Sequence, residues 1–184
     1  NSTTYAIMKA IDDVQSNADS VFWNKYQERG NRTNYGYGFA GKGWNDETFK
    51  PKFDIIHKDG SLQCIFAESG ITNLKAILEE CGVILDFSQA TIGNYLFTGS
   101  AITCMGVLDF SGYSDLSYVL YNAEKLVSVD RFVLKNDGSQ TFNSTYSFGK
   151  LPALEHIVFS GCIGKNGFDI SSSPKLDVES LQSI

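Results

Sequence analysis

The sequence predicts a mixed α/β solenoid in which short parallel strands stack in one curved sheet. Helical or irregular segments are expected to form its other face. Two interleaved phrases predict this fold: FAESGITNL at 66–74 returns as FTGSAITCM at 97–105, and ILDFS at 84–88 returns as VLDFS at 107–111. A period drifting through the low twenties is typical of repeats that each supply one short strand. Successive copies of the second phrase are 23, 24 and 25 residues apart, with apolar cores that begin at Leu85, Leu108, Phe132 and Ile157.

Residues 4–28 are expected to form one helix that ends near Gly30. Its apolar residues recur at alternating steps of four and three, which places them on one stripe: Ile7, Ile11, Val14, Ala18 and Val21. Two interpretations stay open. The helix either covers the open end of the solenoid, or it is the end of a longer stalk that forms a homo-oligomer through a heptad seam.

Residues 31–53 alternate glycine with aromatic residues, and we assign 1–60 to an N-terminal helix followed by an aromatic and glycine-rich cap. Tyr35, Tyr37 and Trp44, together with Tyr113 farther along, are candidates for a platform on which a sugar or peptide could stack. The competing interpretation is that these rings seal the first repeat from water.

Residues 61–184 are assigned to the repeats and a C-terminal cap, forming one folding unit with the cap before them. Alternation along each strand predicts that these residues point inward: Leu85, Phe87, Leu108, Phe110, Phe132, Leu134, Ile157, Phe159, Phe168 and Ile170. The same alternation places two aspartates and two serines on the outer side as candidate ligand-binding residues: Asp86, Asp109, Ser88 and Ser111.

The last repeat is expected to be short, because its strand at 168–171 begins only 11 residues after Ile157. Pro174 then precedes three apolar residues at helical spacing, Val178, Leu181 and Ile184. This pattern predicts a helical C-terminal cap.

Composition limits the function. The chain has 184 residues, of which 42% are hydrophobic and 20% are charged, as in a soluble globular protein. Fifteen basic and twenty-one acidic residues give a net charge of −6 without a basic cluster, which argues against nucleic acid as a partner. No apolar stretch approaches the roughly 18 residues of a membrane helix, so membrane insertion is not expected.

No motif predicts an enzyme, a metal site or a cofactor. His57 and His156 are the only histidines, and the four cysteines lack metal-ligand spacing. Asp86 and Asp109 would lie about 5 Å apart if their strands were neighbours, a spacing compatible with a pair of catalytic carboxylates. Because repeats copy residues without selection for catalysis, a solvated column of aspartates or a contact to a ligand or cation is the preferred interpretation.

The first phrase resembles the BspA-like leucine-rich repeats of bacterial proteins, across roughly residues 62–170. The pattern of Phe, then Cys or Ser, then spaced Leu and Ile matches Phe66, Ser69, Ile71 and Leu74, and again Phe97, Ser100, Ile102 and Met105. Looser copies lie at 120–129 and 148–157. The resemblance implies a curved leucine-rich-repeat solenoid, display outside a bacterial cell and adhesion or host contact, and it implies no catalytic residues.

We therefore expect a non-catalytic module that recognises a protein or a glycan through its strand face. The alternative hypothesis is a structural or receptor-contact component of a prophage particle, in which the N-terminal helix continues an oligomeric stalk.

Overall fold

The structure is a computed structural model that describes residues 38–52, 54–56, 64–91, 95–164 and 166–184. The expected helix at 4–28, with its oligomeric role in the prophage hypothesis, lies outside the described residues, as do Tyr35, Tyr37 and His57. Among the described residues the helices and strands are, in chain order, β1 (Ile55–Ile56), α3 (Leu74–Cys81), β2 (Leu85–Asp86), β3 (Cys104–Asp109), β4 (Ser128–Val133), β5 (His156–Ser160) and α4 (Val178–Gln182).

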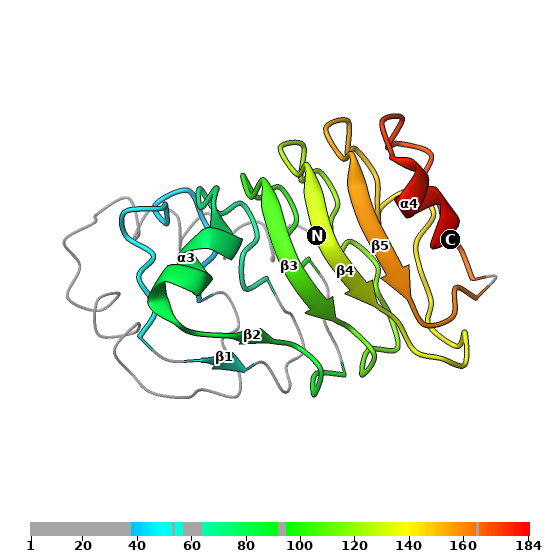
Figure 1. Ribbon diagram of the computed structural model, residues 1–184, viewed down its shortest axis with the longest axis horizontal. Helices are drawn as coiled ribbons and strands as arrows, with labels where there is room; N and C mark the ends of the chain where they lie inside the picture. Colours follow the sequence, from blue (N-terminus) through cyan, green and yellow to red (C-terminus); the bar gives the residue numbers. More distant parts are fainter. Residues whose placement is uncertain (1–37, 53, 57–63, 92–94, 165) are drawn as a thin grey trace, which may run out of the picture.

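The strands are short and parallel, as predicted, and β3, β4 and β5 lie side by side in chain order (Figure 1). The prediction of one curved sheet is wrong for the described strands, since β1 and β2 form a separate parallel pair. The reason is an insertion: eleven positions separate Leu74 from Leu85, whereas three separate the equivalent Met105 and Leu108. The eight-residue helix α3 accounts for the difference and interrupts the strand of its repeat.

The register aligns the inward residues of the three longer strands. Met105 lies beside Val129 and Val129 beside Ile157, and in the same way Leu108 lies beside Phe132. The inward residues predicted for these strands and the turns after them are all buried, whereas Leu85, Phe168 and Ile170 are only partly buried at the edges of the same core. A continuous apolar interior therefore runs along the molecule.

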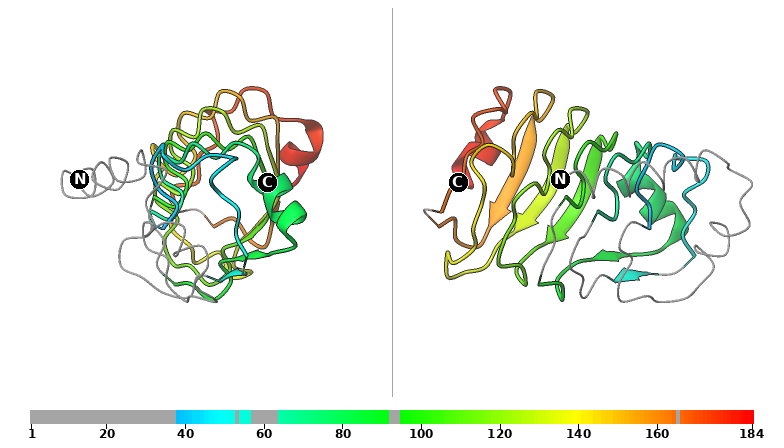
Figure 2. Two further views of the ribbon diagram at one scale, coloured as in Figure 1. Left: turned by 90° about the vertical axis from the view of Figure 1, so that its left-hand side faces the viewer. Right: turned by 180° about the vertical axis from the view of Figure 1, so that it is seen from behind.

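Hydrogen-bonded turns on another side of the molecule connect successive repeats. The Phe66 amide donates to the Leu96 carbonyl at 2.9 Å, the Phe97 amide to Val119 at 3.1 Å, and the Leu120 amide to Ser147 at 3.1 Å. Seen along the long axis, the successive turns of chain overlie one another (Figure 2). Each turn thus supplies hydrogen-bond partners to the backbone of the turn before it.

The aromatic and glycine-rich segment joins this arrangement at its N-terminal end. The Phe39 amide donates to the Ile65 carbonyl at 2.9 Å, which is the bond that the later turns repeat. The ring of Phe39 stacks on Phe66 at 5.4 Å, and Phe66 stacks on Phe97 at 5.5 Å. Repetition in the structure therefore begins before residue 60, where the sequence predicts only a cap.

The strand predicted at 168–171 is absent: Phe168–Ile170 has no regular secondary structure. Phe168 instead packs edge-on against Phe142 at 5.4 Å, a ring that belongs to the turn side of the preceding repeat. The place next to β5 is taken by α4 (Figure 1). The predicted helical cap is present, but it is only five residues long.

Candidate binding groove

The start of the inserted helix α3 is fixed by hydrogen bonds to Asp46, and its end is fixed by a glycine in a left-handed conformation. At its start the Asp46 carboxylate accepts from the Thr72 amide at 2.6 Å and from the Asn73 side chain at 2.8 Å. Partial burial raises the pKa of Asp46, but these hydrogen bonds outweigh it and lower the pKa overall. At its end Gly82 adopts φ 65°, the left-handed conformation that favours glycine after a helix.

α3 and β3 enclose a groove of about 390 Å³. Its walls are mainly apolar, with Leu74 and Leu78 from α3, Val83 and Ile84 from the segment after it, and Met105 and Val107 from β3. Ile84 is 56% exposed and Val107 is 57% exposed, although both are large aliphatic residues. The volume lies within the range of small ligand sites, about 300–1,000 Å³.

Gly106 leaves the floor of the groove open. A Cβ atom placed on this residue would meet no atom within 4 Å, so the space above the backbone is free. Gly112, in the turn after β3, differs, because a Cβ on that residue would lie 2.6 Å from the carbonyl oxygens of Ser88 and Ala90. Gly106 is therefore not required by close packing, and its small size shapes the groove.

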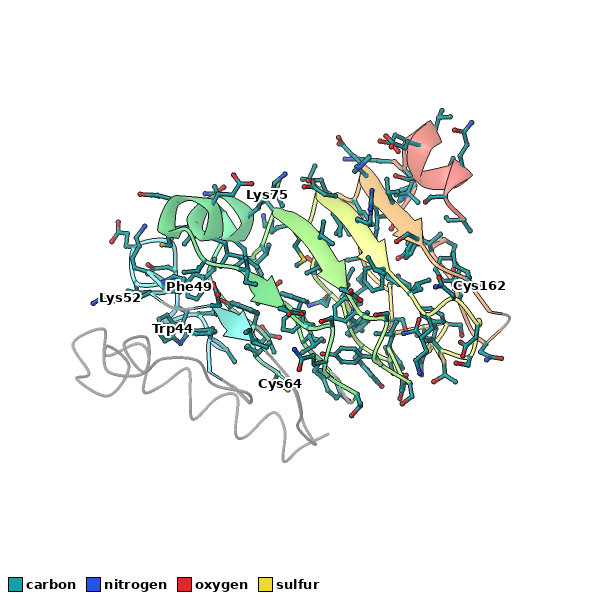
Figure 3. All side chains as sticks on the ribbon, turned by 60° about the horizontal axis from the view of Figure 1, so that its bottom comes forward. Trp44, Phe49, Lys52, Cys64, Lys75 and Cys162 are labelled. Atoms are coloured by element: carbon teal, nitrogen blue, oxygen red, sulfur yellow. The ribbon has the colours of Figure 1, made fainter. Side chains whose placement is uncertain are left out.

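An ion pair crosses one end of the groove. Lys75 Nζ on α3 lies 2.6 Å from the Asp130 carboxylate on β4, so the pair spans β3. Figure 3 labels Lys75 at the end of α3 nearest to β3. The hydrogen bond that Lys75 donates to Asp130, followed by the negative charge of that carboxylate, raises the pKa of the Lys75 amine. Because both side chains are substantially exposed, the pair is expected to contribute little to the stability of the fold.

The four predicted outward residues form two local turns instead of a shared site. Asp86 Oδ1 accepts from the amide and hydroxyl of Ser88 at 2.8 and 2.6 Å. Asp109 Oδ1 accepts from the amide and hydroxyl of Ser111 at 2.9 and 2.6 Å. Each aspartate therefore closes the turn that ends its strand.

Strand pairing does not bring the two aspartates together. Asp86 lies opposite Ile56, and Asp109 lies opposite Val133, because β2 and β3 belong to different sheets. The hydrogen-bonded pairing of these two strands, on which the 5 Å carboxylate spacing depended, is therefore not present between β2 and β3. Among the described residues, no group of three or more histidine, cysteine, aspartate or glutamate side chains could hold a metal ion.

Trp44 does not present a ring for stacking. It is 2% exposed and packs edge-on against Phe39 at 5.2 Å and Phe49 at 6.3 Å, inside the core near the N-terminal end (Figure 3). Tyr113 is also fully buried, and burial raises the pKa of its hydroxyl. The sealing interpretation therefore holds for Trp44, and the platform interpretation for this residue is wrong.

A column of half-buried tyrosines lies on the turn side, and sequence reasoning missed it. Tyr95 stacks on Tyr118 at 4.4 Å, and Tyr118 stacks on Tyr146 at 4.6 Å. Tyr121 meets the last two rings nearly at right angles, and Lys150 Nζ lies 5.5 Å from its centroid. Because the stacked rings cover one another's faces, the column strengthens contacts between repeats and leaves little ring face for a ligand. The signal was present in the sequence: Tyr95, Tyr118 and Tyr146 each lie two residues before the start of a copy of the first phrase.

Searches against protein-family models, curated proteins and solved structures returned no significant match to this chain. Within the part of the chain that the structure describes, no helix has both the length and the apolar character needed to cross a membrane.

Proposed function

We propose that the chain is a leucine-rich-repeat solenoid of the BspA-like type. Three features support this: the parallel register of β3, β4 and β5, the hydrogen bonds that link successive turns, and the apolar interior shared by all repeats. A single repeat of this size cannot enclose a core, so stacked repeats lend one another an interior. The resemblance in sequence supports the leucine-rich-repeat assignment in particular.

We infer that the function is non-catalytic recognition of a protein through the strand face, and that the groove between α3 and β3 is the binding site. The groove is the single observation that carries this inference. Insertions in repeat arrays often build binding surfaces, and α3 is an insertion that exposes Ile84 and Val107. A protein is favoured over a glycan because the walls are aliphatic and Trp44 is buried. Display outside a bacterial cell remains the part of the proposal supported by the resemblance.

The test uses the complete 184-residue chain and a display library of random heptapeptides. Wild type and Gly106→Trp are panned in parallel, because a tryptophan at the open floor fills the groove without displacing the core. Ser144→Trp, at an exposed turn residue, is the matched control. We expect peptides that bind wild type and the control equally but bind Gly106→Trp at least tenfold more weakly, with the same melting temperature for all three proteins. A library that yields no such peptides would disprove the assignment of the groove.

A further inference from the structure

The two outer edges of the β3–β4–β5 sheet differ in what covers their backbone hydrogen-bonding groups. At β5, the hydroxyl of Ser180 accepts from the Ile157 amide at 2.9 Å, and the hydroxyl of Ser183 accepts from the Phe159 amide at 3.0 Å. The helix α4 thus satisfies the strand edge with side-chain oxygens. At β3, by contrast, no described strand pairs with the outer edge. Unpaired strand edges are templates for pairing with another chain, and proteins usually cover them.

The neighbour of that open edge cannot replace a strand. α3 packs beside β3, but its amide and carbonyl groups bond along its own helix axis. The groove between them follows β3 from Met105 to Leu108. At about 3.3 Å per residue, this length accommodates an extended segment of three or four residues.

The charged residues that line the groove favour a ligand with a basic side chain. The ionisable residues that line it are Lys75, Glu79 and Asp130, one basic and two acidic, which gives a net charge of −1 at neutral pH. Asp130 is already paired with Lys75 at 2.6 Å. A ligand that brings a basic side chain to the Glu79 end would balance the remaining charge, and such complementarity steers and selects partners.

We propose that the groove binds an extended segment of a partner protein, which adds to the open edge of β3 as a further strand. The segment places an aliphatic side chain over Gly106, between Ile84 and Val107, and a lysine or arginine beside Glu79. Strand addition supplies backbone hydrogen bonds, while the pocket at Gly106 and the acidic rim provide the sequence preference. This proposal rests on the proposed function and specifies the class of ligand.

The experiment starts from the heptapeptides selected by wild type but lost with Gly106→Trp. Each peptide is resynthesised with single N-methyl groups at successive backbone positions, and its affinity for the full chain is measured by calorimetry. In an extended strand only alternate residues direct their backbone groups to the partner edge. We therefore expect a loss of about fivefold or more at every second position and little loss between, as for one missing hydrogen bond. Hydrogen exchange at the β3 amides should slow when the peptide binds.

A second arm tests the charge. Glu79→Gln should weaken peptides with a basic residue about two- to fivefold, as for a rim charge, whereas Glu80→Gln on the same helix should not. N-methyl losses without alternation, or side-chain losses spaced three and four residues apart, would overturn strand addition while leaving the groove as the binding site. Protection of the β3 amides that grows with protein concentration alone would show that a second copy occupies the edge, which would also overturn the proposal. If no peptide distinguishes wild type from Gly106→Trp, the proposed function itself is wrong.

Discussion

At the scale of single residues, one backbone position in each turn requires positive φ. Five turns place a residue there, and each of the first four donates its amide to the turn that follows. The five residues are Gly41 (φ 91°), Glu68 (56°), Gly99 (67°), Asn122 (61°) and Lys150 (56°). Glycine and asparagine adopt this conformation at low cost, whereas glutamate and lysine do not. The backbone conformation at this position is therefore kept in all five turns, although the residue type differs between them.

Gly99→Ala is expected to lower the free energy of unfolding by about 1–2 kcal/mol, because alanine is strained at φ 67°. Gly106→Ala is the matched control, because the φ of Gly106 is not positive and an added Cβ would meet no atom within 4 Å. This substitution should change the free energy of unfolding by no more than about 0.5 kcal/mol. Urea denaturation of both variants measures the difference. Equal effects would contradict the requirement for positive φ at residue 99.

The aspartates of the second phrase act on the backbone. Asp109→Ala removes the acceptor for both the Ser111 amide and its hydroxyl, so we expect a loss of about 1 kcal/mol in the free energy of unfolding. Asp109→Asn retains an oxygen in the same place and should keep most of the stability. Chemical denaturation of the two variants provides the measurement. A ligand role without a turn role would leave the alanine variant as stable as wild type.

At the scale of elements, α4 covers β5 through polar atoms. Its one buried residue is Ser180, whereas Val178 and Leu181 are 69% and 57% exposed. The apolar spacing therefore predicted a helix correctly but not the face that contacts the protein. A strand edge needs hydrogen-bond acceptors for its amides, and serine hydroxyls on the inner face of α4 provide them.

Ser180→Ala should destabilise the protein by about 1–3 kcal/mol, because it leaves the buried Ile157 amide without a partner. Leu181→Ala, one residue along the same helix, should change stability by no more than about 0.5 kcal/mol. Thermal unfolding followed by circular dichroism compares the two. A larger effect at Leu181 would mean that the helix docks through its apolar side.

The start of α4 should respond to acid. Hydrogen bonds from Ser180, and then from His156, lower the pKa of Asp177 to about 2. Its ordinary value is about 3.9, so the folded protein favours the charged form. The resulting stabilisation is complete above about pH 4 and is lost as the pH falls towards about 2. The difference in melting temperature between wild type and Asp177→Asn should therefore shrink across this interval. A difference that stays constant down to pH 2 would contradict this role for Asp177.

At the scale of the whole molecule, stability is shared between neighbouring repeats. The main hydrophobic core is one cluster of buried residues that runs from Phe39 to Phe159 and so includes residues of every repeat. At the N-terminal end, the rings of Phe39, Phe66 and Phe97 stack on one another in sequence and so connect three successive repeats. Removing one end should therefore weaken what lies beside it.

Deleting residues 1–60 tests this coupling. The deletion removes Phe39, Trp44 and Phe49 from the core and takes β1 away from β2. We expect a lower melting temperature and a broader transition, because Ile65 and Phe66 become exposed to water. Differential scanning calorimetry measures both. A remainder that unfolds as sharply and at the same temperature as the full chain would show that the first residues do not support the repeats.

Much of the fold could be predicted because it depends on local pattern. The inward positions of β3, β4 and β5 follow from alternation, and the C-terminal helix follows from the spacing after Pro174. The FDIS string at 168–171 was misleading because it matches the strand pattern in sequence. In the structure it forms no strand, and Phe168 packs against Phe142. The repeat turn at Phe39 was also missed, because the glycine-rich sequence around Phe39 does not match the phrase that contains Phe66 and Phe97.

The candidate site was predicted less well, for a physical reason. Aspartate at 86 and 109 suggested a ligand, but an aspartate two residues before a serine can equally close a turn, and only coordinates show which bond it makes. The groove depends on the separation between α3 and β3, on the open space over Gly106 and on an edge of β3 with which no described strand pairs. None of these is a property of a short string of residues.

By itself, the sequence determined the repeat, the parallel order of the strands and the residues that face inward, because these follow from periodicity along the chain. Only the tertiary structure decided that α3 divides the sheet, that Trp44 is buried and that no described strand pairs with the outer edge of β3. Those outcomes depend on how segments distant in sequence fill or leave the space between them, and that space is defined only once the chain has folded.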